Sequence, residues 1–124
     1  MRRYALGDAL ARRLNLESGR VDRIGQRAAE AGLLPNAQGS RRYPPDLDTV
    51  HAVNFLLAVL TDDGLGKVAT QVRTFANLSD GDTSLRAALT DLLGSGQALA
   101  GAVNGELIIR LDPATAALTA GGYH

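Results

Sequence analysis

Three arginines and one glutamine recur at near-helical spacing between positions 20 and 27 of the sequence. Side chains three or four positions apart lie on one side of an α-helix, so these four would form a polar stripe. Arginine donates paired hydrogen bonds to phosphates and guanine edges, which are the contacts that a recognition helix makes. The stripe, which continues to Glu30, predicts a surface that contacts nucleic acid, and the residues expected to contact the major groove are Arg20, Arg23, Gln26 and Arg27. A solvated face on an ordinary amphipathic helix is the alternative interpretation of the same pattern.

Two short helices would have to position this stripe, and we expect them at residues 5–14 and 18–31. The second helix also has an apolar stripe that can pack against the protein interior. Its members are Val21, Ile24, Ala28 and Ala31.

A tight corner is expected between the two helices. Asn15 lies at the turn, and asparagine tolerates the left-handed backbone conformation that ends a helix. We expect Leu14 and Leu16 to pack inside the corner, and Ser18 or Glu17 to cap the second helix. This segment resembles the helix-turn-helix of DNA-binding proteins. The matching residues are Leu10, Ala11, Leu14, Asn15, Leu16, Val21 and Ile24.

The residues that follow extend the resemblance. Gly32-Leu33-Leu34-Pro35 ends the second helix, Gly39-Ser40-Arg41-Arg42-Tyr43 forms a basic turn-rich segment, and Asp46-Leu47 opens another helix. This order is similar to the wing region of MerR-type winged-helix regulators, over roughly residues 8–78. The resemblance implies that Arg41, Arg42 and Tyr43 contact the DNA backbone. Arg12 and Arg13, at the end of the first helix, complete the set of expected DNA-binding residues.

The rest of the chain is expected to support this unit. We predict helices at 46–60, 64–78 and 84–93, the last capped by Asp82 or Thr83, and a short helix at 97–103. Strands at 106–111 and 116–120 around a turn at 112–115 would form a β-hairpin, which must pack on the helices, pair with the wing or pair with another chain. The predicted fold is mainly α, a winged helix-turn-helix with additional C-terminal helices and a small β-hairpin. Residues 1–45 would form the helix-turn-helix with its wing, and residues 46–124 a helical support or oligomerisation region.

Charge is distributed unevenly although the formal net charge is zero. Residues 1–45 contain nine arginines and four acidic residues, and residues 46–124 contain four basic and nine acidic residues, so the halves carry +5 and −5. This polarity is what a DNA-facing half and a DNA-averse half would produce.

Composition gives little support to catalysis. The sequence contains no cysteine and two histidines, and no nucleophile, phosphate-loop or metal-ligand pattern stands out. We therefore expect no enzymatic activity, no cofactor and no bound metal. With no long apolar run or secretory signal in sight, we expect a cytoplasmic protein that does not associate with membranes.

The sequence as a whole indicates a bacterial or phage transcriptional regulator that binds double-stranded DNA. We expect a homo-oligomer, with a dimer favoured because paired half-sites multiply affinity. Two alternatives stay open. The layout is similar to that of phage small terminase subunits, DNA-packaging proteins that form rings, and the apolar helix at 46–60 would also suit an adaptor that binds no DNA.

Overall fold

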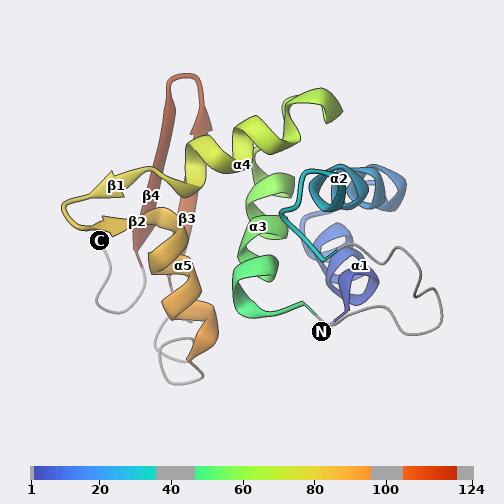
Figure 1. Ribbon diagram of the computed structural model, residues 1–124, viewed down its shortest axis with the longest axis horizontal. Coiled ribbons are helices and arrows are strands. Elements are labelled where there is room, and N and C mark those ends of the chain that lie inside the picture. The colour runs from blue at the N-terminus through green and yellow to red at the C-terminus, as the bar shows by residue number, and fades with distance from the viewer. Residues whose placement is uncertain (1, 36–46, 96–104, 120–124) are drawn as a thin grey trace.

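The structure, a computed structural model of the 124-residue chain, describes residues 2–35, 47–95 and 105–119. Within these ranges the protein is mainly helical with two small antiparallel sheets (Figure 1). The helices there are α1 (Arg3–Arg13), α2 (Ser18–Glu30), α3 (Thr49–Leu60), α4 (Val68–Ala76) and α5 (Leu85–Gly94), with a short 3-10 helix, η1 (Leu65–Lys67), before α4. The strands are β1 (Ser79–Asp80), β2 (Thr83–Ser84), β3 (Glu106–Leu111) and β4 (Ala114–Thr119).

The predicted mainly α fold with a C-terminal β-hairpin is confirmed, and the helix bounds lie close to those expected. Residues 36–45 of the expected wing and the short helix expected at 97–103 lie outside the described residues. The turn of the hairpin is shorter than predicted, because Ala114 and Thr115 already belong to β4 and only Asp112 and Pro113 form the turn.

The prediction for the start of α5 was wrong in detail. Thr83 is not the cap, because it pairs with Asp80 in the small β1–β2 sheet, which the sequence did not predict. The cap is Ser84, whose hydroxyl oxygen accepts a hydrogen bond of 3.1 Å from the backbone N–H of Ala87. The sheet therefore places the start of the helix after Thr83.

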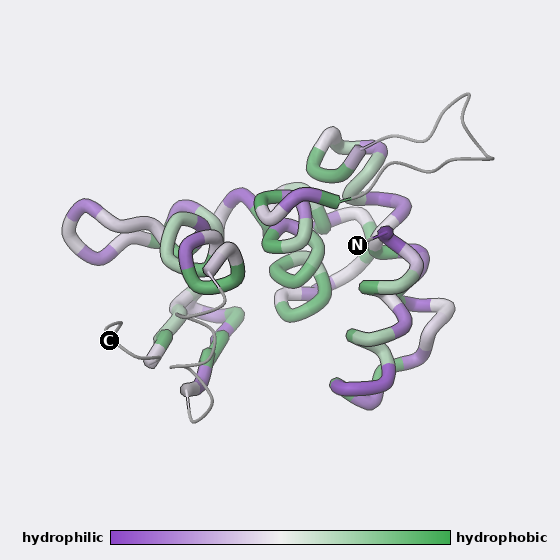
Figure 2. Tube along the Cα trace, turned by 90° about the horizontal axis from the view of Figure 1, so that it is seen from below, coloured by the Kyte–Doolittle hydropathy of each residue, from purple (hydrophilic) through white to green (hydrophobic). Residues whose placement is uncertain are grey.

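α3 is the centre of the core. It contacts α2 on one side and α4 and α5 on the other, which agrees with its apolar character on more than one face (Figures 1 and 2). One continuous cluster of buried side chains runs from Ala11 in α1 to Leu89 in α5. Both the expected DNA-binding unit and the expected support region contribute to this cluster.

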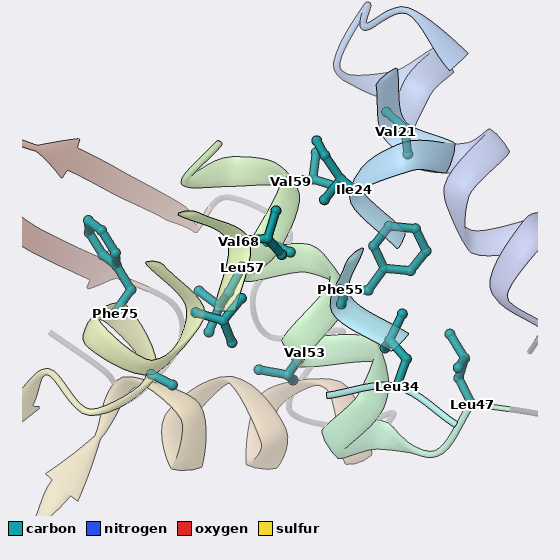
Figure 3. Packing of buried hydrophobic residues seen from close by; sticks show 14 of the residues in the cluster. Val21, Ile24, Leu34, Leu47, Val53, Phe55, Leu57, Val59, Val68 and Phe75 are labelled. Carbon is teal, nitrogen blue, oxygen red and sulfur yellow. The ribbon is translucent and has the colours of Figure 1, made fainter. Parts of the chain in front are cut away.

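Phe55 fixes α3 against the first two helices. Its side chain points from α3 toward α1 and α2, and the residue is 1% exposed (Figure 3). Two glycines leave the space that the ring occupies. A Cβ atom added to Gly25 would lie 3.0 Å from the ring, and one added to Gly7 would lie 3.5 Å from it. We call Gly7 and Gly25 the glycine socket, and it explains why both helices can approach α3 closely.

The C-terminal hairpin packs on the helical core through one face. Alternate residues of β3 and β4 contact the buried cluster, and β4 lies beside α4. The residues that pack are Leu107, Ile109, Ala114, Ala116 and Leu118. The opposite face of the hairpin is open in the described part of the chain, where Ile108 is 42% exposed.

Candidate nucleic-acid interface

The turn between α1 and α2 is tight and contains one left-handed residue. Asn15 has a φ of 55°, as its place in the sequence predicted. The N–H of Leu16 donates a hydrogen bond of 2.8 Å to the C=O of Ala11 and closes the turn. Glu17 is the N-cap residue of α2 but makes no side-chain capping hydrogen bond, so the expected cap is not formed.

α2 has one buried side and one exposed side. The buried residues, which face the core, are Val21, Ile24, Gly25, Ala28 and Ala29. The exposed residues, which face away from it, are Asp22, Arg23, Gln26, Arg27 and Glu30. Three of the expected DNA-binding side chains therefore lie together on the outer side of one helix. Two acidic side chains accompany them, so the formal charges of this outer side balance.

Arg23 is the most N-terminal of these three side chains. Its guanidinium lies 3.9 Å from the carboxylate of Glu17, and the two side chains are 54% and 77% exposed. An exposed pair at this distance is weak and screened by salt. Arg23 can therefore exchange Glu17 for another partner at little cost.

Arg20 belongs to a different environment from the rest of the predicted stripe. Its Nε and Nη2 atoms donate hydrogen bonds of 2.9 and 2.8 Å to the two carboxylate oxygens of Asp62, in the turn after α3. The side chains of this pair are 36% and 25% exposed. A bidentate pair of this kind has fixed geometry. Arg20 thus connects the first turn of α2 to the end of α3, which is a structural role that the sequence did not indicate.

This pair makes the fold sensitive to acid. The hydrogen bonds from Arg20 hold the pKa of Asp62 below its ordinary value of 3.8, and the N–H of Gly64 acts in the same direction. A lowered folded-state pKa means that Asp62 stabilises the protein above about pH 3.8 and that this contribution is lost as pH falls through the folded-state value. Urea unfolding of wild type and Asp62→Asn across this range should show the two stabilities converging as pH decreases.

The neighbouring aspartate provides the control for this prediction. Asp63 is 53% exposed and lies 3.3 Å from the ammonium of Lys67 on the surface. Asp63→Asn should change stability little at any pH, because exposed pairs of this kind contribute little. Equal pH responses of the two variants would contradict the role assigned to Asp62.

The second end of α2 is held by a buried polar contact that sequence analysis missed. Asn54 of α3 is 5% exposed, and its amide donates a hydrogen bond of 2.9 Å to the C=O of Leu33 just after α2. Together with the Arg20–Asp62 pair, this contact ties both ends of α2 to the α3 framework. No local pattern could have paired residues so far apart in the sequence.

Arg12 and Arg13 lie in the last turn of α1 and are exposed. Arg12 donates a hydrogen bond of 3.4 Å to the backbone C=O of Asp8, and both arginines lie where cations interact favourably with a helix C-terminus. Arg12 also borders a shallow hollow that reaches Ser18 at the start of α2. The structure thus brings the end of α1 next to α2. Arg41, Arg42 and Tyr43 lie outside the described residues.

The prediction that the corner leucines are buried was wrong. Leu14 is 40% exposed and Leu16 is 42% exposed. Both leucines lie outside the buried cluster, to which α1 and α2 contribute smaller or β-branched side chains: Ala11, Val21, Ile24, Ala28 and Ala29. Leu16 borders the hollow described above.

No group of three or more histidine, cysteine, aspartate or glutamate side chains that could hold a metal ion occurs among the described residues. In the same part of the chain, each helix is too short or too polar to cross a membrane.

Comparison with known proteins gave no match. No protein-family model, no curated protein and no solved structure is significantly similar to this chain.

Proposed function

We propose that the chain is a DNA-binding protein that inserts α2 into the major groove. The observation that carries the proposal is the outer side of α2, where Arg23, Gln26 and Arg27 are exposed while the inner side packs on the core. An α-helix fits the major groove, and arginine and glutamine are among the side chains that read base edges there.

Contacts to base edges and contacts to the DNA phosphate backbone are assigned to different residues. The outer side of α2 carries balanced charges, which suits hydrogen bonding to base edges more than general attraction to phosphate. Phosphate contacts are assigned to Arg12 and Arg13 at the end of α1. As in the MerR-type wing that the sequence resembles, Arg41, Arg42 and Tyr43 would add contacts to the backbone. Arg20 is left out of the contacting set because both carboxylate oxygens of Asp62 occupy its guanidinium.

The biological role that suits these features best is that of a transcriptional regulator. The four-to-nine ratio of basic to acidic residues after position 45 supports a DNA-averse second half, which would keep DNA on the α1–α2 side. A packaging subunit of the small terminase kind would use the same contacts in a ring, and a DNA-free adaptor would use none of them. Oligomer size separates the first two roles, and retention on DNA separates both from the third.

The test begins with selection of preferred duplexes from a random pool, followed by titration of the selected and a scrambled duplex. Arg23→Ala should weaken binding to the selected duplex by about 1–3 kcal/mol and to the scrambled one by much less, because base contacts carry sequence information. The double variant Arg41→Ala, Arg42→Ala should weaken binding to both duplexes by similar factors, because phosphate contacts carry little sequence information.

Arg73 offers a matched control. It is an exposed arginine on α4, outside the α1–α2 unit. Arg73→Ala should leave both affinities unchanged. Failure of the wild-type protein to bind any duplex would overturn the proposed function. If the Arg41, Arg42 double variant lost specificity while Arg23→Ala kept it, the residues that contact bases would lie outside α2.

A further inference from the structure

β4 has an edge without charged side chains. Within the described residues β3 and β4 pair only with each other, so each strand has one free edge (Figure 1). β3 carries Glu106 and Arg110, whereas β4 consists only of alanine, threonine and leucine. Proteins protect free edges with charges, prolines or bulges, and a regular uncharged edge invites another strand.

The backbone of this edge is oriented for pairing. Ala114 follows the two-residue turn and pairs with Leu111, so its backbone groups face β3. Because the direction of the backbone groups alternates along an antiparallel strand, those of Thr115, Ala117 and Thr119 face the free edge.

We propose that β4 pairs antiparallel with β4 of a second copy about a two-fold axis at Ala117, which produces a four-stranded sheet. In this register Thr115 lies opposite Thr119 of the second copy, and Ala117 lies opposite itself. Directly opposed residues of an antiparallel pair point to the same face of the sheet. Both copies then keep their packed faces on one side and their open faces on the other.

The observed register of the hairpin makes the combined sheet self-complementary. Ile108 is paired with Ala117, so an apolar row runs across all four strands from Ile108 to Ile108 of the second copy. Arg110 is paired with Thr115, and Glu106 with Thr119. The adjacent row therefore begins at Arg110, crosses two threonines and ends at Glu106 of the second copy, with opposite charges at its ends.

The packed face is equally well matched. Ala116 would lie opposite Leu118 of the second copy, and both contact the core in their own chain. A register shifted to centre on Ala116 would instead place Ala117 opposite Thr115 and leave Thr119 unpaired. On the open face, the Ala117-centred register pairs threonine with threonine and alanine with alanine. It also gives a hairpin, which has marginal stability alone, the additional strands that stabilise a sheet.

Sedimentation of the full-length protein tests this inference without DNA, so its outcome does not depend on whether α2 binds DNA. The wild type should be a dimer. Ala117→Lys should convert it to a monomer, because the two ammonium groups would face each other across the axis. Val50→Lys, which adds the same charge at a 42% exposed apolar position on α3, outside the hairpin, should remain a dimer. Circular dichroism of both variants confirms that each is folded.

A single thiol locates the interface, since the sequence contains no cysteine. Ala117→Cys should form a covalent dimer on mild oxidation, whereas Thr115→Cys should do so much less, because Thr115 and its copy are offset along the strands. A monomeric wild type would overturn the proposal. So would an assembly of any size that stays intact in Ala117→Lys and is not cross-linked in Ala117→Cys.

Discussion

Replacing Phe55 by alanine is expected to lower the free energy of unfolding by about 3–5 kcal/mol. The ring is 1% exposed and is the contact by which α3 meets the glycine socket. Its loss removes apolar contact area and leaves a cavity between three helices that the two glycines cannot fill. Urea denaturation followed by circular dichroism measures the effect. If Phe55→Ala still folds, the urea concentration at half-unfolding should fall, while the dependence of the unfolding free energy on urea concentration should not change.

Leu14→Ala is the control for this prediction. Leu14 is 40% exposed, so its truncation should cost about 1 kcal/mol or less. From the sequence alone this leucine was expected in the corner between the helices, where its loss would have cost about 2–4 kcal/mol. Similar losses from Phe55→Ala and Leu14→Ala would mean that the socket is not the main joint between α3 and the first two helices.

DNA affinity is expected to fall at least about tenfold between about 50 and 200 mM salt. Each arginine that neutralises a phosphate releases condensed counterions, and the proposed interface assigns phosphates to Arg12, Arg13, Arg41 and Arg42. Titrations of a labelled duplex across this range give the slope of log affinity against log salt.

The contributions to this slope can be separated. Arg12→Ala and the double change Arg41→Ala, Arg42→Ala should each flatten it, by an amount that follows the number of phosphates lost. Arg20→Ala should leave the slope unchanged, because Arg20 already pairs with Asp62. A flat salt response in the wild type would contradict the electrostatic part of the proposed function.

The helices could be predicted from the sequence because their signals are local. Apolar spacing located α2 and α3, Asn15 marked the turn, and an apolar run with a proline turn located the hairpin. The small β1–β2 sheet escaped prediction because its two-residue strands are too short to show a period.

The candidate interface was predicted only in part, since side-chain pairing between distant residues has no local signal. By its position in the sequence, Arg20 belongs to the same helical stripe as Arg23 and Arg27. Only the folded chain shows that Arg20 differs from them, because there it pairs with Asp62. Leu14 and Leu16 were likewise expected in the core and are exposed, whereas Phe55 is buried against two glycines. The Arg20 and Phe55 contacts both join α2 to α3 or to the turn after it, and no pattern within the first two helices reveals them.

The glycine socket also has a consequence for protein engineering. Because Phe55 fills the gap between α1 and α2, a peptide that stops before α3 would lack the side chain that joins its two helices. Grafting residues 2–35 onto another scaffold should therefore give an unstructured insert, whereas a graft that reaches Leu60 would carry its own connecting side chain. Likewise, a designer who enlarges Gly25 would have to shrink position 55 in the same step, so the two positions must be varied as a pair.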